Sequence, residues 1–503
     1  MRAVVEYNAA DHGRRPIPLC VDLDGTLVRT DMLHEAILDV AKQQPLSLLK
    51  AFGMRNHTKA GIKYRIGELA RLDVSNLPYQ AQIIELITEA RSNGRPIVLA
   101  TAAAPQIAKA VADHLAVFDE VLCSDDNHNL SGQNKAERLV ERFGERGFDY
   151  IGNHYDDLAV WRVARHVVVV SNDNQLFDIA SRHGQTTYRV THAKGGILPL
   201  IKSLRPHQWL KNLLIFLPLV AAHQFADLSL VLNAFLAAIA FSLTASSVYI
   251  ANDLFDLKDD RTHKRKRNRP FASGEASIVS GVALFPALLA AAAGIALLLP
   301  PLFLLTLIAY MVFTTAYSFR LKRQVIFDVI LLAGLYTMRV LAGSAATLIA
   351  PSFWLLAFSM FIFFSLALVK RYTELLGSPI TSTALPGRGY MAADMGVLMS
   401  LGTSSGLVSV LILALYIASP QVVATYQEPI WLWLVLPAIL YWMSRLWMKT
   451  HRGEVHDDPV LFAMRDRQSI IIVLFLAPVV TAARLGFKPW EYLREYQFLS
   501  LFN

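Results

Sequence analysis

The stretch Asn252–Pro270 reads NDLFDLKDDRTHKRKRNRP and directly follows the apolar run LNAFLAAIAFSLTASSVYIA. It contains four acids and seven bases. A solvated helix end is the ordinary explanation for such charge. However, Asn252, Asp256 and Asp260 are spaced by four residues, which places them on one face of a helix. Stacked carboxylates repel one another unless a cation lies between them, and Mg²⁺ is a hard cation that prefers oxygen ligands. The stretch therefore predicts a magnesium site at the end of a membrane span, with Asp253 assisting.

Outside this stretch, the 503-residue chain divides by composition into a mixed N-terminal part and an apolar remainder. Its length favours two or more domains. From about residue 208, apolar runs of roughly 18 to 22 residues recur, which is long enough to cross a hydrocarbon core about 30 Å thick. We expect nine membrane spans, near residues 209–225, 229–251, 277–297, 301–319, 325–346, 353–369, 395–418, 429–446 and 469–486.

Positive charge alternates between the expected loops. The loops after the second, fourth, sixth and eighth spans carry Lys and Arg, whereas those after the first, third, fifth and seventh carry neither. By the positive-inside rule, the N-terminal part is then cytoplasmic and the C-terminus lies outside, in a bacterial inner membrane. These span-end bases account for the net charge of +8, so we expect no nucleic-acid partner. The two separated cysteines fit a reducing compartment.

In the N-terminal part, several strand-like segments end in polar residues. The segment PLCVDLDGTLV at 18–28 delivers two carboxylates into a turn, and PIVLAT ends in a threonine. SGQNKAERL places a lysine at the start of a helix, and FDYIGNHYDDLAV ends a strand with two acids. Strand ends of an open α/β sheet bring such groups together. The groups are Asp22, Asp24, Thr101, Lys135, Asp156 and Asp157.

In this order, the four motifs resemble those of haloacid dehalogenase-type phosphatases. The resemblance implies an N-terminal α/β (Rossmannoid) domain over residues 1–190, with a helical cap at about 30–93. It implies that Asp22 is the nucleophile that forms an aspartyl-phosphate and that Asp24 is the general acid and base. An inactive domain kept as a scaffold is the alternative.

The same resemblance assigns the remaining groups. Thr101 and Lys135 would bind the phosphoryl oxygens, and Asp156 and Asp157 would hold Mg²⁺ together with Asp22 and Asp24. The chemistry is consistent with this, because a carboxylate that attacks a phosphate dianion needs a metal and a cation to offset the repulsion.

The motif at Asn252–Asp260 is similar to that of the UbiA superfamily of membrane prenyltransferases, and the likeness covers essentially all of residues 205–486. The resemblance implies an all-α polytopic bundle of nine transmembrane helices over 207–490. The segment 191–206 would be a linker or interfacial segment, and 491–503 a C-terminal tail.

Shorter motifs look like the decaprenyl-phosphate phosphoribosyltransferase branch of this superfamily: RPHQWLKN at 205–212, YSFRLKRQVIFDV at 317–329, RVLAGSAA at 339–346, VKRYTEL at 369–375 and DPVLFAMRDR at 458–467. That branch moves 5-phosphoribose from phosphoribosyl pyrophosphate to a polyprenyl phosphate. In one departure from ordinary UbiA members, the second DxxxD motif is reduced to Asp328 among bases. Arg339 lies inside an expected span, where an Arg costs about 2.5 to 3.5 kcal/mol, so we expect it to face a polar ligand in the bundle.

The resemblance therefore implies a bifunctional membrane enzyme with Mg²⁺ in both domains. The head would remove the 5-phosphate to give polyprenyl-phosphoryl ribose, a precursor of a cell-envelope arabinose donor. Two alternatives stay open, an aromatic prenyltransferase with an unrelated phosphatase and a non-enzymatic lipid carrier or transporter. The oligomeric state, including a homo-oligomer, also stays open. In the transferase we expect catalytic roles for Asp253, Asp256 and Asp260, and substrate contacts from Lys211, Lys266, Arg267, Arg269, Tyr317, Lys322, Asp328 and Arg339.

Overall fold

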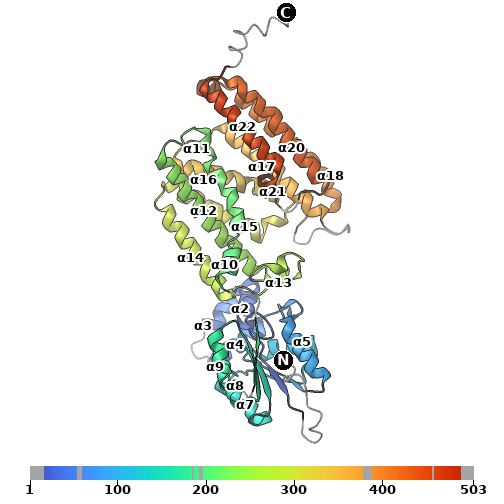
Figure 1. Ribbon diagram of the computed structural model, residues 1–503. Coiled ribbons are helices and arrows are strands. Elements are labelled where there is room, and N and C mark those ends of the chain that lie inside the picture. The colour runs from blue at the N-terminus through green and yellow to red at the C-terminus, as the bar shows by residue number, and fades with distance from the viewer. Residues whose placement is uncertain are drawn as a thin grey trace, which may run out of the picture. The chain divides into compact units, whose positions relative to one another are not determined.

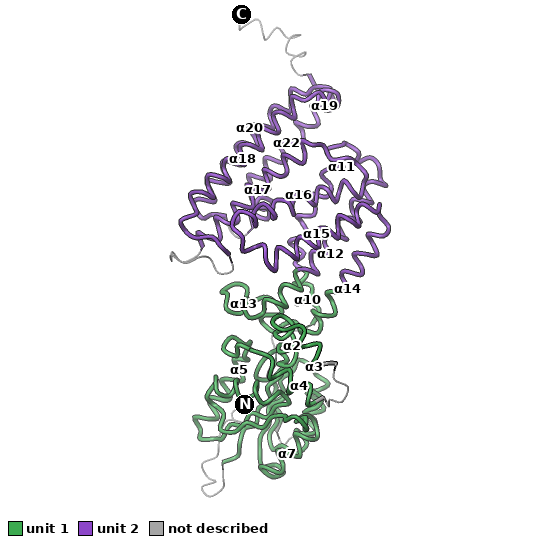
Figure 2. Tube along the Cα trace, turned by 180° about the vertical axis from the view of Figure 1, so that it is seen from behind, with its two compact units in different colours: residues 1–204, 249–287 green, residues 205–248, 288–503 purple. Residues whose placement is uncertain are grey.

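The computed structural model describes residues 16–53, 59–183, 186–191, 196–377, 388–455 and 458–488. The chain forms two compact units, coloured separately in Figure 2. Unit 1 comprises residues 1–204 and 249–287, and unit 2 comprises residues 205–248 and 288–503. The charged stretch at 252–270 therefore belongs to unit 1. The expected tail at 491–503 lies outside the described residues.

Unit 1 contains a six-stranded sheet in the order β3-β2-β1-β4-β5-β6, and every neighbouring pair is parallel. This is the strand order of a doubly wound α/β fold, in which the direction of winding reverses between β1 and β4. Ligands bind such sheets at the carboxyl ends of these two strands. The expected α/β domain is confirmed. The strands are β1 (Leu19–Val21), β2 (Ile97–Ala100), β3 (Glu120–Leu122), β4 (Asp149–Gly152), β5 (His166–Val170) and β6 (Thr186–Val190).

The sheet is buried on both faces because successive apolar residues of each strand point to opposite sides. Leu19 and Val21 join one core with α5 (Ala81–Ser92) and α6 (Pro105–Leu115). Cys20 joins the opposite core, whose helices α7, α8 and α9 are labelled in Figure 1. The two cores fix the strand ends that carry the polar groups. These three helices are α7 (Gln133–Phe143), α8 (Leu158–Val163) and α9 (Asn174–Ala180).

A helical insertion follows β1 within the range of the predicted cap. It contains α2 (Met32–Gln43), α3 (Pro45–Gly53), α4 (Lys59–Leu69) and the 3-10 turn η1 (Val74–Asn76). Asp31 begins α2 as its N-cap, because its side chain accepts hydrogen bonds from two backbone N–H groups of the first turn. Helix α5, which also lies within the expected cap range, buries its apolar face in the core of the sheet.

Eight helical segments among the described residues are long and apolar enough to cross a membrane. The first expected span, near 209–225, is not confirmed, because the chain there forms a 3-10 helix, η3 (Pro206–Phe216), and the short α11 (Leu217–Ala221). Pro218 has no backbone N–H, which disfavours one continuous α-helix through this segment. The eight segments are α12 (Leu228–Phe255), α14 (Ile278–Ala296), α15 (Pro301–Phe319), α16 (Phe327–Thr347), α17 (Phe353–Leu376), Ala392–Ile417 with α18 (Met395–Ile417), Pro429–His451 with α20 (Val435–His451), and α22 (Arg467–Leu485).

The remaining short helices join these segments. They are α10 (Ile197–Ser203), α13 (Leu257–Thr262), η4 (Lys266–Asn268), η5 (Leu321–Arg323), η6 (Ala392–Asp394), α19 (Pro420–Thr425), η7 (Pro429–Leu434) and α21 (Pro459–Arg465).

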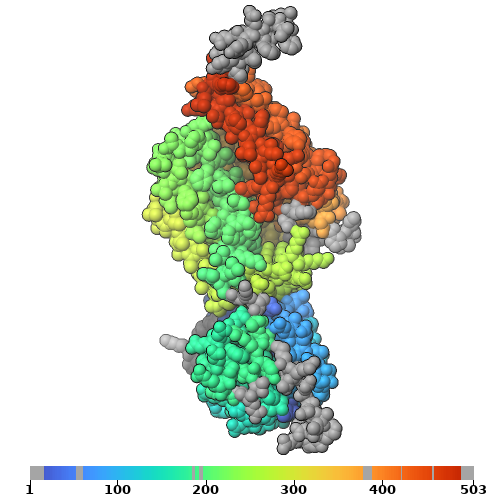
Figure 3. Space-filling view, viewed as in Figure 1, coloured from blue at the N-terminus to red at the C-terminus, as the bar shows by residue number. Residues whose placement is uncertain are grey.

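The helices of unit 2 are apolar on their outer faces, as lipid contact requires. On α15, Leu302 and Leu305 are 55% and 62% exposed, whereas Phe303 and Leu307 are buried. In the space-filling view, the C-terminal helices in red lie against the green segment that contains η3 and α11 (Figure 3). A hydrogen bond of 2.9 Å between His223 Nε2 and the Tyr426 hydroxyl also joins the segment after α11 to the C-terminal part.

Candidate functional sites

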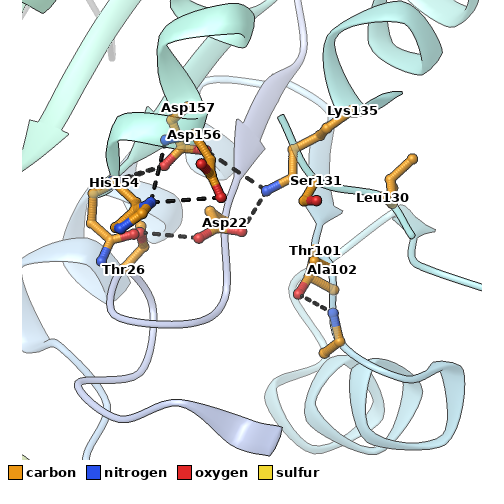
Figure 4. Close-up of polar contacts among 12 residues, drawn as sticks. Asp22, Thr26, Thr101, Ala102, Leu130, Ser131, Lys135, His154, Asp156 and Asp157 are labelled. Atoms are coloured by element: carbon orange, nitrogen blue, oxygen red, sulfur yellow. Dashed lines mark hydrogen bonds and ion pairs between the residues drawn. The ribbon is translucent and has the colours of Figure 1, made fainter. Parts of the chain in front are cut away.

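The first candidate site lies at the carboxyl ends of β1 and β4 and is centred on a buried ion pair. Lys135, near the start of α7, places its ammonium 2.7 Å from Asp22 Oδ1 and 3.7 Å from Asp157 Oδ1 (Figure 4). The Tyr150 hydroxyl accepts a hydrogen bond from Lys135 at 2.9 Å and donates one to Asp157 at 2.8 Å. The sequence motifs identified Lys135 and both acids, but not Tyr150, which lies inside β4.

The two acids that follow β4 have different surroundings. Asp157 is buried, and its Oδ2 accepts hydrogen bonds from the backbone N–H groups of Asn153 and His154, both at 3.0 Å. Asp156 is exposed, and its carboxylate lies 3.7 Å from His154 Nδ1. Asp157 therefore faces Asp22 and Lys135, whereas Asp156 lies at the rim of the site (Figure 4).

The turn after β1 places the second carboxylate of the DxD pair. Gly25 has φ +71°, and a Cβ added to it would lie 2.1 Å from the Asn153 side chain, so glycine is required there. Asp24 Oδ1 accepts a hydrogen bond of 2.7 Å from the backbone N–H of Met32, the first residue of α2. The first residue of helix α2 is therefore hydrogen-bonded to Asp24, the predicted general acid.

Burial and neighbouring charges shift the protonation of this site. Burial raises the pKa of Asp22 to about 6, even though Lys135 lowers it. Burial, together with the charges of Asp31 and Asp22, raises the pKa of Asp24 to about 7. Burial alone lowers the pKa of the Lys135 ammonium, but the two carboxylates outweigh that effect and raise it. Near neutral pH the site thus holds an ionised Asp22 beside an Asp24 that exchanges a proton, as acid–base work requires.

Thr101 and the cap complete this site. Thr101 directly follows β2, is fully buried, and accepts a hydrogen bond of 3.0 Å from the Ala103 N–H, so it shapes the loop that follows. Lys63 of α4 donates to the Ala102 carbonyl oxygen and the Asn129 side chain, both at 3.3 Å. A cavity of about 20 Å³ lies among Asp24, Lys63 and this loop. Lys63 lies in none of the four motifs, so it was not among the predicted site residues.

The second candidate site is the charged stretch at 252–270, and its acids converge on one base. The same nitrogen of Arg269, Nη1, lies 3.0 Å from Asp253 Oδ1 and 2.6 Å from Asp260 Oδ2. Both acids are 1% exposed. Burial raises the pKa of Asp260, although Arg269 opposes the shift. Asp253, which was predicted only to assist, is therefore one of the two buried acids, and Arg269 lies between them.

The other predicted residues of this stretch are more open. Helix α12 ends at Phe255, and Asp256 lies between α12 and α13 with φ −100° and ψ 16°. Although Asp256 itself lies outside the two helices, its N–H donates to the Asn252 carbonyl oxygen at 2.9 Å and its carbonyl oxygen accepts from the Asp260 N–H at 2.8 Å, so the four-residue spacing of the row is kept. Asn252 and Asp256 are half-buried, whereas Lys266 and Arg267 of η4 are exposed. The ligand assignment stays a prediction.

Mg²⁺ fits the chemistry of both sites, because each gathers the oxygens of buried carboxylates around one cationic side chain. Asp22 and Asp157 share Lys135, and Asp253 and Asp260 share Arg269. Hard oxygen donors of this kind are the usual ligands of Mg²⁺. Within the described ranges, no group of three or more Asp, Glu, His or Cys side chains is close enough to bind one ion, so each site would also use amide or substrate oxygens.

In unit 2, Arg339 is buried inside α16, and aromatic rings surround it. Its guanidinium carbon lies 5.3 to 5.4 Å from the ring centroids of Phe241, Tyr310 and Tyr336. It also donates a hydrogen bond of 3.0 Å to Asn212 Oδ1. Cation–π contacts of this kind stabilise a desolvated charge by up to about 2 kcal/mol. As expected, Arg339 points into the bundle.

Lys211, one residue before Asn212, is also buried. It forms an ion pair with Asp458, the N-cap residue of α21, and its ammonium lies 5.6 Å from the centroid of the Tyr336 ring. The motifs RPHQWLKN and DPVLFAMRDR, which are far apart in the sequence, therefore meet through this pair. The sequence singled out Lys211 and did not identify Asp458 as its partner.

Asp328, at the start of α16, lies in a polar cluster in which both of its carboxylate oxygens accept hydrogen bonds. Its Oδ2 accepts from Arg371 Nε and its Oδ1 accepts from the Tyr390 hydroxyl, both at 2.5 Å. Asp328 and Arg371 are both fully buried. Tyr317 accepts hydrogen bonds from Arg371 at 2.6 Å and from Arg388 at 3.1 Å. Lys322 of the nearby η5 is half-buried.

Two family models match the chain. The model described as the UbiA prenyltransferase family matches residues 213–470, and the model described as haloacid dehalogenase-like hydrolase matches residues 19–162. The chain is also 36% identical over 473 residues to a Sinorhizobium fredii protein with the name "Uncharacterized protein y4nM", which covers 93% of this chain and 91% of that protein. Both parts of the chain therefore have counterparts within one relative.

Two further relatives match a smaller share of the chain. The chain is 33% identical over 291 residues to "Nodulation protein NoeC" of Azorhizobium caulinodans, covering 57% of this chain and 93% of that protein. It is 32% identical over 198 residues to "Decaprenyl-phosphate phosphoribosyltransferase" of Mycobacterium tuberculosis, covering 37% of this chain and 63% of that protein. The chain belongs to the UbiA prenyltransferase family and carries a haloacid dehalogenase-like hydrolase domain at its N-terminus.

Proposed function

We propose that the chain transfers 5-phosphoribose from phosphoribosyl pyrophosphate to a polyprenyl phosphate and then removes the 5-phosphate with its head. The transferase half of the proposal rests on the hydrogen bonds that Asp328 accepts. Arg371 and Tyr390 occupy both of its oxygens, so this acid is committed to protein contacts, and the stretch at 252–260 supplies the acids for a metal. The relative whose name gives a decaprenyl-phosphate phosphoribosyltransferase activity supports the choice of substrates.

In the transfer step, Asn252, Asp256 and Asp260 would hold Mg²⁺ with help from Asp253, and the bound ion would offset the negative charge of the leaving pyrophosphate. Arg269, already beside Asp253 and Asp260, and the exposed Lys266 and Arg267 bind the phosphate oxygens. The bond between ribose C1 and the pyrophosphate oxygen breaks. An oxygen of the lipid phosphate forms the new bond to C1, and this anion needs no general base.

In unit 2, Arg339 and Lys211 supply buried positive charge for the anionic substrates. The aromatic cage holds Arg339 in place, and Asp458 fixes Lys211. Tyr317, Lys322 and Asp328 form the remaining predicted substrate region, in which Asp328 acts through Arg371. The proposal also allows the protein to form a homo-oligomer, and it assigns no residue to the interface.

In the head, Asp22 attacks the phosphorus of the 5-phosphate, and Asp24 donates its proton to the departing ribose oxygen. Asp24 then accepts a proton from the water that hydrolyses the aspartyl-phosphate. Lys135 and Thr101 hold the phosphoryl oxygens. Mg²⁺ held by Asp22, Asp24, Asp156 and Asp157 would reduce the charge repulsion between nucleophile and phosphate.

Joining the two activities in one chain raises the effective concentration of the first product at the second site. We place the head and the charged loops in the cytoplasm of a bacterium and the C-terminus outside its inner membrane, on the basis of the alternating loop charges. This topology needs nine crossings, so the segment through η3 and α11 would cross the membrane in addition to the eight helical segments. The product is then a polyprenyl-phosphoryl ribose, suited to be a precursor of a cell-envelope arabinose donor.

The test measures pyrophosphate release by the purified full-length protein from phosphoribosyl pyrophosphate, Mg²⁺ and polyprenyl phosphate. Release is expected from the wild type and should be lost in Asp256→Asn. A matched reaction with a prenyl diphosphate and an aromatic acceptor tests the competing transferase activity that the family name suggests. Turnover of that pair alone would reject phosphoribosyl transfer. Equal release by the wild type and Asp256→Asn would reject the metal assignment.

A further inference from the structure

Within unit 1, the cap helix α2 contacts the charged stretch through a buried ion pair. Glu35 Oε1 accepts from Arg261 Nη2 at 2.5 Å, and Glu35 Oε2 accepts from Arg261 Nη1 at 3.2 Å. The Arg261 and Glu35 side chains are only 7% and 5% exposed. Two parallel bonds between a guanidinium and a carboxylate fix orientation as well as distance. The pair therefore defines how α13 lies on the cap.

A second contact from α2 reaches the end of α12. Lys42 donates a hydrogen bond of 2.8 Å to the carbonyl oxygen of Phe255, the last residue of that helix. The same ammonium lies 4.0 Å from Asp256 and 3.9 Å from Asp259. A cation at a helix C-terminus interacts favourably with the helix dipole and with the last carbonyls. Lys42 thus fixes the point at which α12 gives way to α13.

These two contacts flank two of the predicted magnesium ligands, Asp256 and Asp260. Asp256 follows Phe255 directly, and Asp260 directly precedes Arg261. Arg261 also donates through Nε to the Ala272 carbonyl oxygen at 3.0 Å, which ties it to the chain that follows Arg269. The α2 contacts therefore constrain both the acids of the stretch and the segment that carries their shared base.

Charged groups, rather than continuous apolar packing, make up much of this contact. A cavity of about 130 Å³ remains here, lined by Lys42, Arg71 and Lys258 as well as by apolar residues. Lys258 lies 3.9 Å from Asp73 of the cap on the exposed side. Gly274 has φ +74°, and a Cβ added to it would lie 2.6 Å from the Arg29 side chain. Loss of one charged contact therefore leaves the stretch room to shift.

We propose that α2 of the phosphatase head is a positioning element of the transferase, in which Glu35 and Lys42 hold the stretch at 252–270 in the shape that binds a magnesium diphosphate. The inference rests on the proposed function, because it takes the stretch to be the metal–diphosphate site. Glu35 and Lys42 are positioning residues, since they act through Arg261 and the end of α12. The head thereby contributes to the transferase beyond its own phosphatase chemistry.

The test measures binding of magnesium pyrophosphate by the full-length protein in nanodiscs. All variants carry Asp22→Asn, which silences the head. Binding at the charged stretch is taken as the part of the binding signal that is lost when Asp256→Asn is added. Glu35→Arg should weaken binding about tenfold, within the usual range of coupling between sites. The swap Glu35→Arg with Arg261→Glu should restore most of the affinity. Lys42→Met, a change at a more exposed side chain, should weaken binding by about threefold.

Glu85→Arg is the matched control, because it makes the same charge change on an exposed face of the head, on α5. A pair that only stabilises the fold would lower the thermal midpoint of Glu35→Arg and leave its affinity at the wild-type value. That result would overturn the inference, as would failure of the swap to restore binding in a folded protein. Normal binding without turnover of phosphoribosyl pyrophosphate would reject the proposed function alone. No binding by the wild type would reject both.

Discussion

Asp22 in the head and Asp328 in the membrane part are both buried aspartates paired with a base, yet they are not equally saturated. Asp22 is 7% exposed, and one oxygen lies 2.7 Å from Lys135 while the other has the Thr26 hydroxyl at 3.5 Å. Asp328 is 0% exposed, and each of its oxygens accepts a hydrogen bond of 2.5 Å. The first carboxylate retains the capacity to react, and the second is fully engaged in holding helices together.

The difference follows from the elements that carry each acid. Asp22 ends a strand at the point where the sheet reverses its winding, so its side chain faces a crevice. Asp328 starts a helix that packs against α17, which supplies Arg371. Burial alone therefore does not distinguish a reactive acid from a structural one. The two kinds of acid are distinguished by the number and length of the hydrogen bonds that each already accepts.

The largest expected effect concerns the reactive acid. Asp22→Asn removes the proposed nucleophile and should reduce phosphatase activity by roughly 10⁴-fold or more. Its thermal midpoint should stay near that of the wild type, because the amide fills the same volume. Phosphate release from a soluble phosphomonoester and a melting curve measure the two. Residual activity within tenfold of the wild type would contradict the assignment of Asp22.

The structural acid should show the opposite pattern. Arg371→Met leaves Asp328 buried without its cation and should destabilise the membrane part by about 3 to 5 kcal/mol. The double variant Arg371→Met with Asp328→Asn removes both charges and should recover a large share of that loss. Thermal unfolding in detergent measures both. A stable Arg371→Met protein would place Asp328 among reactive acids and remove the contrast.

Proton release on magnesium binding tests the raised pKa values of Asp22 and Asp24. With pKa values of about 6 and about 7, Asp22 and Asp24 in the metal-free head still hold part of their protons between about pH 6 and 7. Mg²⁺ binds the ionised carboxylates, so binding should release protons between about pH 6 and 7 and none above about pH 9. Calorimetry in two buffers of different ionisation enthalpy gives the number. The double variant Asp22→Asn with Asp24→Asn should lose this release, and an unchanged value would show that other groups supply the protons.

The smallest expected effect concerns the cap lysine. Lys63→Met removes hydrogen bonds to the Ala102 carbonyl oxygen and Asn129 beside Asp24, and should lower phosphatase kcat/KM by about two- to tenfold. Lys109→Met, on the exposed face of α6, is the control and should behave like the wild type. Identical kinetics for the two variants would limit the role of Lys63 to the surface of the cap.

Much of the head could be predicted from its sequence because short apolar strands end in polar residues, and parallel strand ends share one edge. Asp22, Asp157 and Lys135 meet for that reason. In the charged stretch, helical spacing predicted a row through Asp256, and backbone hydrogen bonds at that spacing join Asn252 to Asp256 and Asp256 to Asp260. The interruption of the helix at Asp256 could not be predicted, because no proline or glycine lies there.

Ion pairs between residues that are far apart in the sequence could not be predicted from a single sequence. Arg371 lies 43 positions from Asp328, and Arg261 lies 226 positions from Glu35. A basic residue at a span end is expected for topology alone, so its pairing with one acid leaves no local pattern. The count of spans has the same limit, since hydropathy does not distinguish a 3-10 segment such as η3 from a membrane helix.

The most direct test of the account is the lipid product made from labelled phosphoribosyl pyrophosphate and polyprenyl phosphate, identified by mass spectrometry. The wild type should give polyprenyl-phosphoryl ribose without a 5-phosphate. Asp22→Asn should accumulate the same lipid with the 5-phosphate retained, and Asp256→Asn should form neither. Retention of the 5-phosphate by the wild type, or the same product from the wild type and Asp22→Asn, would contradict the assigned role of the head.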